Sequence, residues 1–120
     1  MLRPLLFLAL LAPAAADAEF ASPPRASRSE QGTTVAFALR SPSDVEVAVL
    51  DARGGVVRHL AAGVLGGRNA PPAPLRAGLE QQLVWNGKDD LGGEAAGGPF
   101  TIRVRAGMRT RFGRMIGGSP

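Results

Sequence analysis

The chain has 120 residues, with 14 basic and 10 acidic side chains, one His and no Cys. This length leaves room for one small domain. The lack of Cys excludes a disulfide-stapled fold, and with a single His it also excludes the Cys and His clusters that bind zinc or copper. Residues 103–120 hold five Arg and no acid, so the net charge of +4 does not indicate a basic face across the whole domain.

Residues 1–18 are typical of a secretory signal peptide. Arg3 precedes the apolar run LLFLALLAPAAA, and the residues ADA at 16–18 have the small-x-small pattern of a cleavage site. The run is shorter than the ~20 apolar residues that span a membrane. Pro4, directly before the run, and Pro13 within it disfavour the alternative of a buried helix. We therefore expect export to the periplasm, cell surface or medium, with no transmembrane segment after cleavage.

Residues 19–32 are polar, contain a Pro pair and show no periodicity, which predicts a linker or flexible arm. Residues 33–40 then alternate, with Val35, Phe37 and Leu39 on one face, as in a half-buried strand. The sequence SPSD that follows is a turn signal.

The segment 45–60 carries the clearest hairpin pattern. Val45, Val47 and Val49 alternate with polar or small residues, which predicts a strand with these three valines inward. The sequence DARGG at 51–55 is typical of a tight connection in which Gly takes a positive φ. We therefore expect the chain to return as a second strand over residues 56–60.

Residues 61–78 contain four Gly and three Pro, a density that a central strand does not tolerate. We expect a long loop here, with at most a short edge segment at 64–65. Alternation resumes at 79–85, where Leu83 and Trp85 should be buried and Gln81 should lie near the end of the sheet.

The segment 99–106 alternates as well, which predicts apolar residues inward and Arg103 and Arg105 outward. Five short strands separated by Gly- and Pro-rich turns predict an all-β fold. The expected architecture is an Ig-like or fibronectin III-like antiparallel β-sandwich.

The stretch VWNGKDDLGG at 84–93 holds the only Trp, the only Lys and two adjacent Asp residues. A calcium loop, a phosphate-binding turn and a tight structural turn are the three interpretations. The spacing of its oxygen-bearing side chains differs from that of calcium loops, and no helix follows its glycines. We interpret it as a turn in which Asn86-Gly87 reverses the chain, Asp89 and Asp90 accept hydrogen bonds from loop N–H groups, and Trp85 anchors the loop.

The single His, His59, has no second His and no Cys with which to form a nucleophilic site. We interpret it as a surface or partly buried strand residue. We therefore expect no enzyme activity, no catalytic, cofactor-binding or metal-binding residue, and no small-molecule substrate.

Two segments, DVEVAVLDARGGVVRHLAAG and LVWNGKDDLGGEAAGGPFTIRVRA, resemble the Ig-like domain named after FlgD, the flagellar hook-capping protein. That domain has a D-x-x-G hairpin, a return strand of the pattern hydrophobic-V-x-x-L, a W-D-G-x-D-x-x-G turn and a G-x-Y final strand. The matching positions here are Asp51, Gly54, Val57, Leu60, Trp85, Gly87, Asp89, Gly92, Gly98 and Phe100. Asn86 replaces the usual Asp, and Phe100 replaces the usual Tyr.

The resemblance covers residues 33–106 and implies an Ig-like domain there. Residues 107–120 would then be an Arg-rich tail, either a linker to a further domain or a segment packed on its own sandwich. The signal peptide argues against a hook cap, and similar domains also occur as accessory modules of large secreted bacterial proteins.

The resemblance thus implies a non-catalytic exported module, either a structural spacer or a protein-interaction domain, from a short or truncated relative of a larger secreted protein. Neighbouring domains or other exported proteins would be its partners. The alternative is a surface-attachment or secretion-sorting module that binds anionic polymer or export machinery. Nucleic acid is disfavoured because Phe112 is the only aromatic residue among the tail arginines.

Overall fold

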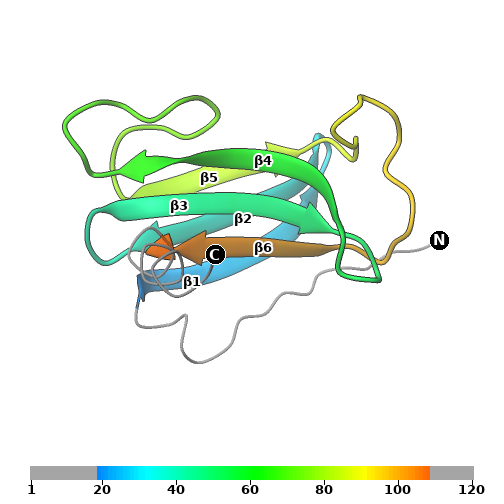
Figure 1. Cartoon of the computed structure of the whole chain (residues 1–120), viewed down its shortest axis with the longest axis horizontal. Coiled ribbons are helices and arrows are strands. Elements are labelled where there is room, and N and C mark those ends of the chain that lie inside the picture. The colour runs from blue at the N-terminus through cyan, green and yellow to red at the C-terminus, as the bar shows by residue number, and fades with distance from the viewer. Residues whose placement is uncertain (1–18, 109–120) are drawn as a thin grey trace, which may run out of the picture.

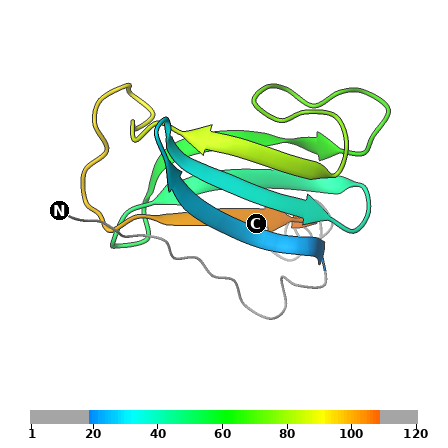
Figure 2. The same cartoon turned by 180° about the vertical axis from the view of Figure 1, so that it is seen from behind.

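The computed structural model describes residues 19–108, which form two antiparallel three-stranded sheets (Figure 1). The strands are β1 (Phe20–Ser29), β2 (Gly32–Leu39), β3 (Ser43–Leu50), β4 (Val56–Leu65), β5 (Glu80–Trp85) and β6 (Thr101–Ala106). The strand orders are β1-β2-β5 and β4-β3-β6. The sheets face each other (Figure 2), which confirms the predicted all-β sandwich. The expected signal peptide and the residues beyond Met108 lie outside the described part of the chain.

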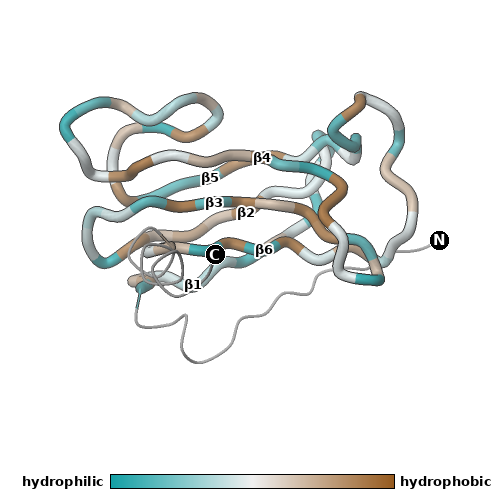
Figure 3. The backbone as a smooth tube through the Cα atoms, in the orientation of Figure 1, coloured by the Kyte–Doolittle hydropathy of each residue, from teal (hydrophilic) through white to brown (hydrophobic). Residues whose placement is uncertain are grey.

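The core lies between the inner faces of the two sheets. Val45, Val47 and Val49 of β3 are at most 1% exposed, and Val35 and Phe37 of β2 pack in the same cluster. Apolar and polar positions alternate along β3 and β6 in Figure 3. The inward positions predicted for the strands after residue 32 are therefore confirmed.

The prediction of a linker over residues 19–32 is wrong, because residues 20–29 form the edge strand β1. Phe20 is 2% exposed and packs edge-on against Phe37, with ring centroids 6.1 Å apart. Backbone pairing with β2 holds the polar remainder of β1 in place. Pro23 and Pro24 are tolerated because they lie on an edge strand, where the register shifts twice.

The long loop after β4 is shorter than predicted, because β4 continues to Leu65, which is fully buried. β4 accommodates Gly63 as an edge strand, and loop residues pack against that glycine. A Cβ at Gly63 would lie 2.9 Å from the Pro72 side chain and 3.2 Å from that of Leu75. Gly63 contributed to the prediction of a loop, yet it lies in a strand, where its lack of a side chain allows the following loop to pack closely on β4.

The described chain begins and ends at the same end of the sandwich. The Glu19 carbonyl accepts the Arg40 N–H at 3.1 Å, and the Asp44 carbonyl accepts the Gly107 N–H at 3.1 Å. A Cβ at Gly107 would lie 3.4 Å from the Glu19 carboxylate, so the two ends are in contact distance. The turn at 51–55 and the loop at 86–98 lie at the opposite end (Figure 1).

Replacing Phe20 tests whether β1 is part of the folded domain. Phe20→Ala should lower the free energy of unfolding by about 3 kcal/mol, because it removes a buried ring and leaves a cavity. Ser27→Ala, an exposed change on the same strand, should alter it by less than about 0.5 kcal/mol. Urea denaturation of both variants measures this, and equal stabilities would show that β1 does not contribute to the core.

Candidate functional site

The loop that follows β5 is held by Trp85 and by its own backbone. The indole is 6% exposed, and its Nε1 donates a hydrogen bond to the Lys88 carbonyl at 2.8 Å. The Asn86 side-chain oxygen accepts the Lys88 N–H at 3.0 Å. The Gly87 carbonyl accepts the Ala95 N–H at 2.9 Å. The predicted burial of Trp85 and the predicted Asn86-Gly87 turn are therefore confirmed.

Asp89 shapes the tip of this loop. Its Oδ1 accepts the N–H groups of Leu91 and Gly93, at 3.0 and 2.9 Å, and its own N–H donates to the Gly93 carbonyl at 2.8 Å. Gly92 closes the turn with φ of +93°, a left-handed conformation that favours glycine. The prediction that loop N–H groups bind this carboxylate is confirmed for Asp89.

The hairpin turn between β3 and β4 has the same arrangement. Asp51 Oδ1 accepts the N–H groups of Arg53 and Gly55, both at 2.9 Å, the Asp51 N–H donates to the Gly55 carbonyl at 2.8 Å, and Gly54 has φ of +89°. Both turns have the pattern D-x-x-G-G, the signal from which their common structure could have been predicted.

Asp90 ties the loop to β4, an edge strand with β3 on one side only. Its N–H donates to the Val57 carbonyl at 2.9 Å, its Oδ1 accepts the His59 N–H at 2.9 Å, and its Oδ2 lies 2.7 Å from His59 Nδ1. Asp90 thus binds free backbone groups of the edge, as a neighbouring strand would. The prediction that the acid binds its own loop is therefore wrong for Asp90.

The contacts with His59 lower the pKa of the Asp90 carboxyl below its ordinary value. The hydrogen bond from the His59 backbone N–H contributes most, and the one with its side chain comes next. His59 itself is exposed on β4, as expected for a surface strand residue. Within residues 19–108, no three His, Cys, Asp or Glu side chains are grouped so that they could hold a metal ion.

Gln81 has a structural role that its sequence position did not indicate. It is 3% exposed, and its amide oxygen accepts the Arg76 N–H at 3.0 Å. Its amide nitrogen donates to the carbonyls of Arg76 and Gly78, at 2.7 and 3.0 Å. Its place near the start of β5 agrees with the prediction, and its three hydrogen bonds order the loop at 66–79.

Arg103 and Arg105 lie on the outer face of β6, as predicted, where both contact one carboxylate of β3. Glu46 Oε1 lies 3.3 Å from Arg103 Nη2 and 3.0 Å from Arg105 Nη2. The first two arginines of the basic C-terminal end are therefore partly neutralised. The other three, at 109, 111 and 114, lie outside the described residues.

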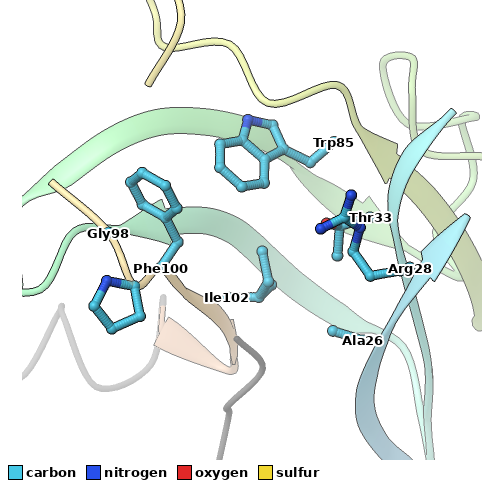
Figure 4. A pocket seen from close by; sticks show the side chains of 8 residues that line it. Ala26, Arg28, Thr33, Trp85, Gly98, Phe100 and Ile102 are labelled. Carbon is cyan, nitrogen blue, oxygen red and sulfur yellow. The ribbon is translucent and has the colours of Figure 1, made fainter. Parts of the chain in front are cut away.

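An apolar pocket of about 280 Å³ opens between β1 and β6 (Figure 4). Its wall includes the rings of Trp85 and Phe100, which meet edge-on with centroids 5.2 Å apart. Ile102 of β6 lies beside them, and Ala26 and Arg28 line it from β1. The space exists because β1 places the single methyl group of Ala26 on the inner face of its sheet.

The sequence did not predict this pocket, because it depends on two strands that are about 75 residues apart in the chain. Comparison with protein-family models, with curated proteins and with solved structures finds no match. In the described part of the chain, no helix has the length and apolar character needed to cross a membrane.

Replacing Asp89 tests the structural interpretation of the loop. Asp89→Ala should lower the free energy of unfolding by about 1–2 kcal/mol, because two N–H groups lose their acceptor. Asp89→Asn keeps an acceptor oxygen and should cost less than half as much. Chemical denaturation with and without Ca²⁺ is the measurement. A stabilisation by Ca²⁺ that the Asp89→Ala change abolishes would contradict this interpretation.

The contact between Asp90 and β4 should make stability depend on acid pH. Because the Asp90 pKa is lower in the folded than in the unfolded state, its contribution is complete above the unfolded value of about 4 and is lost as pH falls through the folded value. The difference in unfolding free energy between the wild type and Asp90→Asn should therefore be constant near neutral pH and shrink as pH falls below about 4. Urea denaturation across this range measures it, and a constant difference would refute the assignment.

Proposed function

We propose that this protein is an exported, non-catalytic module of the FlgD Ig-like type that serves as a protein-interaction domain of a larger secreted assembly. Support for the family comes from the role of the matching residues. Asp51, Gly54, Asp89 and Gly92 form the two equivalent turns, and Trp85 anchors the second of them. The residues that carry the resemblance are therefore those that hold this fold.

The observation that carries the proposal is the contact between the two ends of the described chain. Glu19 and Gly107 lie side by side at one end of the sandwich. After cleavage behind Ala18, Glu19 is the N-terminus, so a parent chain would be joined beyond Gly107, at this same end of the sandwich. An in-line spacer would instead need connections at opposite ends. The arrangement therefore favours an interaction domain over a spacer.

The uses of the polar side chains support a non-catalytic role. The Asp89 carboxylate accepts backbone N–H groups of its own loop, the Asp90 carboxylate binds β4, and the Gln81 amide binds the loop at 66–79. Each of these groups stabilises backbone conformation through hydrogen bonds. These polar groups therefore serve to hold the backbone in its conformation.

Site-specific photo-crosslinking in the exporting bacterium tests this proposal. A photoreactive residue is placed in turn at Leu91, Val84 and Val64, which are 96%, 40% and 38% exposed on different parts of the surface. We expect a mature N-terminus at Glu19 and a discrete protein adduct from at least one position. An uncleaved cytoplasmic chain, or the absence of a protein adduct at every tested position, would overturn the proposal.

A further inference from the structure

The two long sides of the sandwich differ in how they are covered. On the side of β4 and β5, the loop at 66–79 packs Pro72 and Leu75 against β4. The loop at 86–98 covers the same edge, because Asp90 binds the backbone of Val57 and His59. Figures 1 and 2 show both loops on this side. The free edge of β4 is therefore protected.

On the opposite side, β1 and β6 each pair with one strand only within residues 19–108. β1 is a poor template for a further strand, because Pro23 and Pro24 lack N–H groups and its register with β2 is irregular. β6 has no proline, and its pairing with β3 runs without a register shift from Thr101 to Ala106. A regular edge that no other described strand pairs with can accept another strand.

The apolar pocket lies directly beside this edge of β6. Phe100, directly before β6, and Ile102 of β6 line it on one side, and Ala26 and Arg28 line it from β1. Its volume of about 280 Å³ and its largely apolar lining suit one large aliphatic or aromatic side chain. A strand added to β6 would direct every second side chain toward this space. The free edge and the pocket thus form one continuous surface.

The charged residue that lines the pocket is basic. β1 and β6 contain no acidic residue, and of their four arginines Arg28 lines the pocket, whereas Arg25, Arg103 and Arg105 lie on the outer faces. Glu46 neutralises part of the charge of the β6 pair. Arg28 makes no ion pair within residues 19–108, and its side chain reaches into the pocket (Figure 4). An occupant of this opening should therefore combine an apolar group with negative charge.

We propose that this opening binds an extended, acidic segment of a partner protein, which adds a strand to β6, inserts one large apolar side chain between Trp85, Phe100 and Ile102, and places a carboxylate near Arg28. The inference rests on the proposed interaction function and names its partner chemistry. The residues 109–120 of the chain itself are a poorer occupant, because they hold three Arg and no acid.

A designed peptide tests the site directly on the full chain. The probe is the capped nonapeptide Thr-Thr-Glu-Thr-Phe-Thr-Glu-Thr-Thr, which presents Phe and both Glu on one face of a strand. Trp85, the only Trp, lines the pocket and reports binding through its fluorescence. Ala in place of Phe should weaken binding about tenfold or more, and Lys in place of both Glu should weaken it severalfold. N-methylation of alternate backbone amides along the pairing edge should abolish binding.

Matched variants of the protein locate the site. Arg28→Glu should weaken probe binding about three- to tenfold. Arg25→Glu makes the same charge change on the opposite face of β1, against Ala36, and should change it less than about twofold. Ala26→Leu fills the pocket and should block the probe, whereas Ala21→Leu at an exposed position of β1 should not. Circular dichroism verifies that each variant is folded.

Four results would overturn the proposal. The first two are no binding by the probe, and equal binding by the Arg28→Glu and Arg25→Glu proteins. The third is stronger probe binding by Phe112→Ala, which would show that the C-terminal segment competes for the opening. The fourth is self-association of the protein that Ala26→Leu abolishes. The last two would assign the opening to residues 109–120 or to a second copy. If the probe fails while photo-crosslinking at Leu91, Val84 or Val64 still captures a protein, the proposed function stands and only this site is wrong.

Discussion

The burial of the Trp85 indole is the interaction on which the rest of the molecule depends. The ring closes one end of the core, packs against Phe100 and holds the Lys88 carbonyl through its Nε1. Register places it beside Thr33 and, through Thr33, in line with Arg28. One side chain therefore supports the loop after β5 and also forms the wall of the pocket, so that the stability of the loop and the shape of the pocket are coupled.

Sheet edges set the second constraint. Two three-stranded sheets have four edge strands, and each edge has backbone groups that need partners or water. Here Asp90 provides partners for β4, and prolines and register shifts make β1 irregular. The turn at 51–55 also contacts the loop at 86–98, because the Gly97 carbonyl accepts the Ala52 N–H at 2.8 Å. At the end of the sandwich opposite residues 19 and 107, hydrogen bonds therefore join the loop at 86–98 to the turn at 51–55 and to β4. The edge of β6 is regular, and the pocket lies beside it.

The strands and turns that are determined by neighbouring residues could be predicted from local sequence patterns. Period-two alternation identified β2, β3, β5 and β6, and Asn86-Gly87 and Asp51-to-Gly55 identified turns, because both signals arise within a few residues. β1 was missed because its polar side chains and prolines obscure the alternation, and Phe20 alone fills a core position. The Asp90 contact with β4 joins residues 31 positions apart, and no local pattern encodes such a pair.

The pocket was unpredictable for a related reason. It requires Ala26 and Phe100 to face each other across two sheets, and neither residue is unusual in its own segment. Gln81 was recognised as a polar residue in an apolar row, yet its partners lie in a loop whose path depends on prolines and on packing against Gly63. Fold class therefore follows from composition and periodicity, whereas the position and lining of the pocket follow from tertiary contacts.

The adjacent chain ends also determine how the domain responds to tension. A pull applied through residues 19 and 107 would load the hydrogen bonds of β1 and β6 from the same end, at Phe20 and at Ala106. Bonds loaded in this way break one after another, as in the opening of a zipper, whereas ends at opposite poles would load a whole ladder in shear. The domain would therefore open readily under a pull on its two ends, and it is better suited to a position in which it is attached at one end and carries no load.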